Sequence, residues 1–318
     1  MLHRSATLPP PPATVRPVPG WVRPKPQSYE ALDAVFQAGA SLAALDPIAR
    51  DTPAWSGVFR QRLALQAAAT SLRLIGRRED LGQLRDAQLL RRPGDDPGPA
   101  GRVLLAWRQL AGRSPDWSEA AIARAASGFG LALSATELKA LADLASEAAG
   151  SARAAIVAVA ELSERVVKVR PDAEILALWL ADAVLAQKFK WVLPVPLLAT
   201  AMLEPGIRIG AAGRRPRPGG EGWQPALALA YARAAAGAID LAGELARRSD
   251  SLQAAAPKLR AKGAGAVIAA FLNDDALAGS AKIGGISDRG LRRLFDRLVS
   301  LGALRELSGR PSFRIYGL

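Results

Sequence analysis

Apolar residues recur at helical spacing along most of the chain after residue 28. The first run includes Leu32, Val35 and Phe36, continues to Leu45 in steps of three and four residues, and is broken at Pro47. The same spacing predicts further helices over residues 54–76, 79–90, 100–111, 152–169 and 223–248. We therefore expect a mainly α-helical protein with a helical bundle over residues 28–250.

Two serines mark the starts of further helices in the bundle. Ser118 precedes an alanine-rich run, and Ser134 is followed by Glu137. The pair Ser134 and Glu137 has the spacing of a capping box, in which each side chain accepts a hydrogen bond from a backbone N–H that the first turn leaves free. Residues 91–99, which are rich in proline, glycine and aspartate, predict a loop.

The segment Ile175–Leu185 is apolar nearly all round, which is typical of a helix buried in the middle of a bundle. Asp182 is the one acidic residue within it. A buried carboxylate of this kind is either a functional group or a structural partner, and we expect it to pair with an arginine.

Three segments do not fit a helical pattern. Residues 1–27 contain many prolines and several basic side chains, which predicts an extended or disordered basic tail that is either solvated or follows phosphates or another subunit. Residues Arg208–Arg217 form a basic loop rich in glycine and proline, and Ser249–Pro257 has the composition of a linker. The linker would separate the bundle from a second domain over residues 258–318.

The last part of the chain carries the most specific pattern. Gly263–Leu272 predicts a first helix, Asp275–Lys282 a short second one, and Ser287 the N-cap of a third that ends near Leu301. Two strand-like runs then follow, over residues 303–307 and 312–316, around a turn. Three helices followed by a small β-hairpin are the order of a winged helix-turn-helix.

The third of these helices has two chemically distinct faces. Its leucines and Phe295 gather on one side, whereas its arginines gather on the opposite side. Guanidinium groups bind guanine and phosphate in a bidentate way, so this face suits double-stranded DNA. The residues that we expect to contact DNA are Ser287, Arg289, Arg292, Arg293, Arg305, Arg310 and Arg314.

The charge distribution agrees with this assignment. The chain has 42 Lys and Arg residues against 29 Asp and Glu, a net charge of +13, and residues 258–318 hold 11 of the former and 5 of the latter. A basic domain with such a helix favours a polyanionic partner. Winged helices also serve as protein-interaction modules, however, and three arginines on a helix can also be a solvated face.

The composition excludes several classes of enzyme. There is no cysteine, and the single histidine is His3 in the tail, which excludes disulfides, thiolate metal sites and a Ser–His–Asp triad. No phosphate-binding glycine loop framed by a strand and a helix is present. We therefore expect no enzymatic activity, no cofactor and no metal site.

No segment has the length of a membrane span or a signal peptide. The longest uncharged apolar stretches, Trp191–Leu203 and Gly263–Asn273, fall short of the ~18 residues that a span requires. We therefore expect a cytoplasmic protein without a membrane partner.

Several segments resemble the uncharacterised alphaproteobacterial domain-of-unknown-function family numbered 1403. They are Trp55–Asp80, Arg85–Ala87, Arg92–Arg102, Leu180–Gln187 and Pro194–Leu198. The family brings no known activity. The ending Leu301–Tyr316 is similar to the terminal winged helix of related rhizobial proteins and to the C-terminus of some Fic-domain proteins, but the catalytic motif of the Fic proteins is missing.

Two hypotheses follow from the sequence. The first is a DNA-binding protein, a transcriptional regulator or a replicon-maintenance factor, whose bundle mediates homodimerisation or contacts a protein partner. The second is a helical protein-interaction scaffold whose winged helix packs on the bundle or on a partner. Exposure of Arg289, Arg292 and Arg293 would favour the first hypothesis, and pairing of these side chains with carboxylates of the bundle would favour the second.

Overall fold

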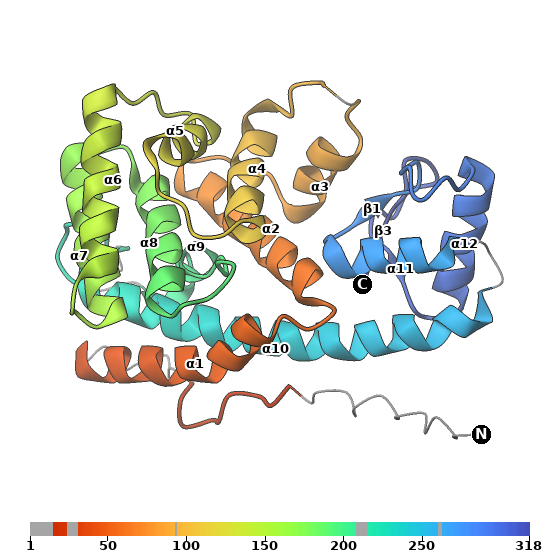
Figure 1. Cartoon of the computed structure of the whole chain (residues 1–318), viewed down its shortest axis with the longest axis horizontal. Coiled ribbons are helices and arrows are strands. Elements are labelled where there is room, and N and C mark those ends of the chain that lie inside the picture. The colour runs from red at the N-terminus through yellow and green to blue at the C-terminus, as the bar shows by residue number, and fades with distance from the viewer. Residues whose placement is uncertain (1–14, 24–30, 93, 208–214, 260–262) are drawn as a thin grey trace, which may run out of the picture.

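The computed structural model describes residues 15–23, 31–92, 94–207, 215–259 and 263–318. These residues form a mainly helical protein with a small three-stranded antiparallel sheet near the C-terminus (Figure 1). The helices of the bundle are α1 (Ala31–Asp51), α2 (Ser56–Leu74), α3 (Leu81–Leu89), α4 (Gly98–Gly112), α5 (Glu119–Gly128), α6 (Ala135–Gly150), α7 (Ala155–Val169), α8 (Glu174–Lys188), α9 (Leu198–Ala201), η1 (Pro205–Ile207) and α10 (Trp223–Ala255).

The centre of the bundle is built around α8, as the all-round apolar pattern predicts. Every residue from Ile175 to Ala186 is buried, and α6, α7 and α9 pack against this helix. The predicted N-caps are also present, since Ser118 Oγ accepts a hydrogen bond from Ala121 N and Ser134 forms a capping box with Glu137. A further capping box joins Asp80 and Gln83 at the start of α3.

Helix α1 packs along α10, and two of our boundary predictions are wrong in this pair. The break predicted at Pro47 does not occur, because α1 continues to Asp51 with Leu45 and Ala49 buried on either side of the proline. The linker predicted over Ser249–Pro257 is also helical: α10 runs to Ala255 and continues into η2 (Ala256–Lys258). Tertiary burial thus overrides the local signals in both places.

Helix α10 is 33 residues long and joins the bundle to the C-terminal part of the chain (Figure 1). The segment Trp223–Lys258 is long and apolar enough to cross a membrane, but 72% of its most apolar window is buried inside the protein. Such burial is what the core helix of a helical bundle requires.

The C-terminal module, residues 263–318, contains α11 (Ala264–Asn273), β1 (Leu277–Ala278), α12 (Asp288–Ser300), β2 (Arg305–Glu306) and β3 (Ile315–Gly317). The strand order is β1-β3-β2, with Leu277 opposite Tyr316 on one side and Glu306 opposite Tyr316 on the other. The rings of Phe271, Phe295 and Tyr316 form the core of this module, with successive centroids 5.2 and 5.0 Å apart.

Two predictions for this module need correction. The short helix predicted over Asp275–Lys282 is wrong, because Leu277 and Ala278 are extended and hydrogen-bonded to β3. The second predicted strand is displaced towards the C-terminus, because Phe313 has a φ of +54° and interrupts the extended conformation. Both features depend on partners that are distant in the chain.

The predicted tail is only partly among the described residues, since residues 1–14 and 24–27 lie outside them. Of the rest, Val18 and Val22 are buried, and Arg23 forms a bidentate ion pair with Asp240 of α10 at 2.6 and 2.9 Å. In the predicted basic loop, Arg208 and Arg214 also lie outside the described residues, while Arg215 binds Glu174 of α8 at 2.5 Å.

Candidate nucleic-acid interface

The N-cap of α12 and the contacts of its apolar face with the core fix the orientation of this helix in the module. Ser287 is the N-cap, as predicted, and its Oγ accepts a hydrogen bond from Gly290 N at 3.2 Å. Leu291, Leu294, Phe295 and Leu298 are buried beneath the helix. This anchoring fixes the direction in which the opposite face points.

The opposite face of α12 is a row of exposed arginines. Arg289, Arg292 and Arg293 are exposed, and so is Arg297, which lies one turn beyond Arg293. The acid nearest the start of the helix, Asp288, pairs with Lys282 at 2.5 Å. Within the described part of the chain, none of the four arginines takes part in an ion pair or donates a side-chain hydrogen bond.

The position of α12 in the molecule explains this exposure. The C-terminal module meets the bundle through α11, which packs on α2 and on the end of α10. Figure 1 shows α12 on the side of the module that faces away from the bundle. The arginine face is therefore turned outwards.

A groove separates α12 from the segment that precedes β3. Its lining residues are Gly279, Ser280, Arg292, Asp296, Pro311, Ser312, Phe313, Arg314 and Tyr316. Arg314 is exposed, and a hydrogen bond with Tyr316 raises the pKa of its guanidinium. Arg305, on the outer strand β2, is exposed as well.

Arg310 differs from the other predicted DNA-binding residues because the bundle already binds it. Its Nη1 and Nη2 donate to the two carboxylate oxygens of Asp86 in α3 at 2.8 and 2.6 Å. The hydrogen bond with Asp86 raises the pKa of Arg310. Its Nε and Nη2 also donate to the carbonyl oxygen of Phe313, at 3.2 and 3.1 Å.

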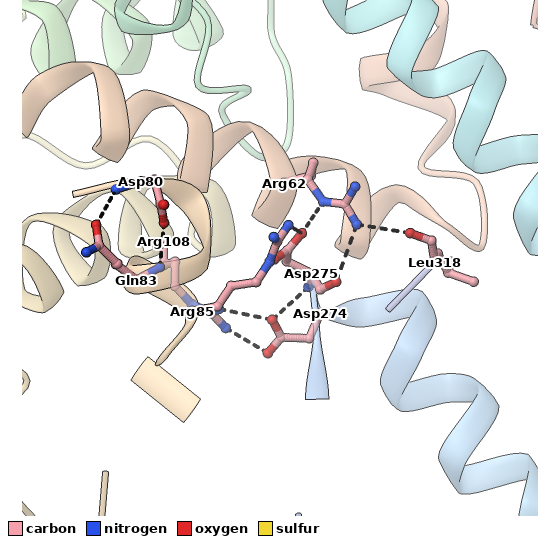
Figure 2. Close-up of polar contacts among 8 residues, drawn as sticks. All are labelled: Arg62, Asp80, Gln83, Arg85, Arg108, Asp274, Asp275 and Leu318. Atoms are coloured by element: carbon pink, nitrogen blue, oxygen red, sulfur yellow. Dashed lines mark hydrogen bonds and ion pairs between the residues drawn. The ribbon is translucent and has the colours of Figure 1, made fainter. Parts of the chain in front are cut away.

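Three arginines of the bundle bind the two aspartates that follow α11, and we call this set the Arg–Asp clamp (Figure 2). Arg85 of α3 donates to the Asp275 carboxylate at 2.6 and 3.2 Å, and Arg62 of α2 binds the same carboxylate. Arg108 of α4 forms a bidentate pair with Asp274 at 2.7 and 3.0 Å. The clamp joins three bundle helices to the C-terminal module.

Asp275 is 3% exposed, so its charge must be compensated inside the protein. Burial by itself opposes ionisation of this carboxyl group, but the hydrogen bonds and positive charges of Arg85 and Arg62 outweigh it and lower its pKa. Arg62 also donates to the backbone oxygen of Leu318 at 3.3 Å, which ties the end of the chain to the same place.

Asp182 has different partners from the arginine that we expected, and that prediction is wrong. Its carboxylate accepts hydrogen bonds from Leu197 N at 2.8 Å, from Leu198 N at 3.2 Å and from Tyr231 Oη at 3.0 Å. Because it is completely buried without a cation, its pKa rises to about 7. The side chain thus binds the start of α9 and Tyr231 of α10 in the core.

Several residues of the candidate interface were not foreseen. Arg297 follows the predicted face by one turn and could have been found from its spacing. Ser280, Ser312 and Phe313 enter the groove only through the folding of the sheet, which no local pattern indicates. No group of three or more acidic or histidine side chains suited to a metal ion occurs within the described ranges.

The chain matches the model of the family described as Protein of unknown function (DUF1403) over residues 11–318. The chain belongs to this DUF1403 family. No curated protein and no solved structure matches the chain significantly. The family covers nearly the whole chain, so the bundle and the C-terminal module are both parts of the DUF1403 unit.

Proposed function

We propose that this DUF1403 protein binds double-stranded DNA through its C-terminal module, as a transcriptional regulator or a replicon-maintenance factor. The module would act as a winged helix-turn-helix, with α12 as the recognition helix and the β2–β3 hairpin as the wing. The strand order β1-β3-β2 supports this interpretation, since the β2–β3 hairpin pairs with a strand that precedes α12, and the segment before β3 lines a groove beside α12. The segment that joins β1 to α12 is a pair of turns in place of a regular second helix.

The observation that carries the proposal is the exposed arginine face of α12. Arg289, Arg292 and Arg293 are exposed on a helix that lies on the side of the module away from the bundle (Figure 1), while the arginines of the Arg–Asp clamp are paired with carboxylates. An unpaired guanidinium can form two parallel hydrogen bonds with guanine or with a phosphate at little reorganisation cost. The arginine face of α12 therefore suits a partner with regularly spaced anionic groups, such as the phosphates of a duplex.

The groove beside α12 extends this surface. With α12 in the major groove, one sugar–phosphate strand would lie between the helix and the segment 311–314. Arg292 and Arg314 supply positive charge there, and the hydroxyl groups of Ser280 and Ser312 supply neutral donors. Asp296 lies in the same groove and interacts with Arg314. Because its carboxylate is negative, phosphates would lie away from Asp296.

The proposal is tested by measuring the binding of fluorescent mixed-sequence duplexes by anisotropy at several salt concentrations. The triple variant Arg289→Ala, Arg292→Ala and Arg293→Ala should bind about 100-fold more weakly or worse, since each arginine contact is worth ~1–3 kcal/mol. The slope of log K against log salt should fall by up to about 2.7, because ~0.9 is lost for each of the three arginines that contacts a phosphate.

A matched control separates this effect from a general loss of charge. Arg73, Arg78 and Arg113 are exposed arginines of the bundle, and replacing all three with alanine lowers the net charge by the same amount. The control variant should keep most of the affinity. Equal loss in the two triple variants would contradict the assignment of α12.

The Arg–Asp clamp favours a second candidate function, a protein-interaction scaffold, because it shows that the module packs on the bundle. In that case α12 would contact a protein, and the wild type would not bind duplex DNA in a salt-dependent way. A homodimer formed through the bundle is compatible with both functions, and it is measured by sedimentation of the intact chain.

A further inference from the structure

Phe313 is an exception among the aromatic residues of the C-terminal module. Phe271, Phe295 and Tyr316 are buried, whereas Phe313 is 71% exposed at the rim of the groove beside α12. Its φ of +54° lies in the left-handed region, which is unfavourable for a bulky side chain. A strained, exposed aromatic ring persists only where the surrounding contacts determine its position.

Those contacts come from the module itself, and one of them is in turn held by the bundle. The carbonyl oxygen of Phe313 accepts two hydrogen bonds from the guanidinium of Arg310, and the same guanidinium is bound by both oxygens of Asp86 in α3. On the other side of Phe313, the carbonyl of Arg314 accepts a hydrogen bond from Gly279 N at 2.8 Å. Asp86 therefore fixes the backbone of Phe313 through Arg310, although 227 positions separate the two residues in the sequence.

The surroundings of Phe313 indicate which partner its ring would contact. Arg314 is its neighbour in the chain, Arg292 lies across the groove, and both side chains are exposed. The groove also contains Pro311, the buried ring of Tyr316 and one acid, Asp296. Among its lining residues, however, Phe313 is the one large exposed hydrophobic side chain, and two arginines and two serines lie around it. Cationic and hydroxyl groups around a single exposed ring match a nucleic-acid strand, whose phosphates and sugar edges alternate.

Resting on the proposed function, we infer that Phe313 is an apolar wedge that enters the minor groove of the bound duplex. If one DNA strand lies between α12 and the segment 311–314, α12 faces the major groove of the duplex and Phe313 faces its minor groove. Aromatic and aliphatic side chains inserted there separate adjacent base pairs and bend the duplex. Asp86 is the positioning residue that holds this wedge in place from the bundle.

The experiment uses the full-length protein and a pool of ~30-base-pair mixed-sequence duplexes with a donor and an acceptor dye at opposite ends. Wild-type protein should bend the duplex by ~20–90°, which raises energy transfer between the ends. Phe313→Ala should abolish the bend and weaken binding about tenfold, the usual effect of losing one ring–base contact. Phe313→Trp should restore both, because it also presents an aromatic ring.

Two further variants test the specificity and the positioning role. Phe36→Ala removes another exposed phenylalanine, in α1, and should leave bend and affinity unchanged. Asp86→Asn should lower the bend, and the double variant with Phe313→Ala should show no loss beyond that of Phe313→Ala alone, since both changes act through one contact. Additive losses would overturn the positioning role of Asp86.

The results separate this inference from the proposed function. If Phe313→Ala bends and binds the duplexes like the wild type while the α12 triple variant fails to bind, the wedge is refuted and DNA binding stands. If the wild type binds no duplex, both are refuted. A normal thermal unfolding curve for Phe313→Ala, expected because the side chain is exposed, excludes misfolding as the cause of a loss.

Discussion

Arginines lie on two sides of the C-terminal module, those of the bundle on its inner side and those of α12 on its outer side, and their surroundings are opposite. On its inner side, Arg62 and Arg85 converge on Asp275, and all three side chains are largely buried. On its outer side, Arg289 and Arg293 are exposed and form no ion pair within the described residues. The comparison shows that the number of arginines in a segment does not distinguish a structural contact from an exposed cationic surface. An arginine becomes structural where a carboxylate from a distant segment of the chain pairs with it.

The largest expected effect concerns the inner surface. Asp275→Ala leaves Arg62 and Arg85 next to each other without a negative charge, and removal of one partner of a buried ion pair costs about 3–5 kcal/mol. We expect the free energy of unfolding to fall by that amount in urea or guanidinium titrations of the full chain.

Asp250→Ala is the matched control, since Asp250 is an exposed aspartate on α10 and its loss should change stability by less than ~0.5 kcal/mol. A loss as small for Asp275→Ala as for the control would mean that the Arg–Asp clamp does not hold the module on the bundle.

A second effect contrasts Asp275 with Asp182, which is buried without a cation. The pKa of Asp182 is raised from 3.8 to about 7 in the folded protein. The stability that this residue contributes is therefore complete below about pH 4, decreases as the pH rises, and is lost above about pH 7. The free energy of unfolding of the wild type, relative to that of Asp182→Asn, should therefore fall by on the order of 3 kcal/mol as the pH rises across this range.

The measurement is a set of denaturant titrations of both proteins between pH 4 and pH 8. Asp250→Asn provides the baseline, because an exposed carboxyl group should give a nearly flat difference curve. A flat curve for Asp182→Asn as well would show that burial does not govern the ionisation of Asp182.

The smallest expected effect concerns the exposed arginines of α12. Arg293→Ala should change the free energy of unfolding by less than ~0.5 kcal/mol, as expected for an exposed side chain without a partner. The same substitution should lower the salt slope of duplex binding by about 0.9 if this arginine meets a phosphate. A marked loss of stability would instead place Arg293 among the structural arginines.

Much of the fold follows from local patterns in the sequence. The 3.6-residue period identifies the helices, the all-round apolar segment identifies buried α8, and Ser134 and Ser287 cap helices as expected. The features that local patterns miss depend on contacts between distant segments. Pro47 lies inside α1 because the helix packs along α10, and Leu277 is extended because β3 lies beside it.

The candidate interface is predictable to a smaller extent. The arginines of α12 are recognised from their spacing, since opposite faces of one helix can be assigned from the sequence. Their exposure, the pairing of Arg310 with Asp86 and the left-handed backbone of Phe313 could not be predicted. Each of these depends on how the module docks on a bundle that is encoded some 200 positions earlier.

Helix α10 has a mechanical consequence. It starts with buried Trp223 in the bundle, continues without a break to Ala255, and contacts α11 near its end. At ~1.5 Å per residue it is a strut about 50 Å long. A displacement of the α1–α10 pair at the far end of the bundle would therefore be transmitted along this helix to the C-terminal module and to α12.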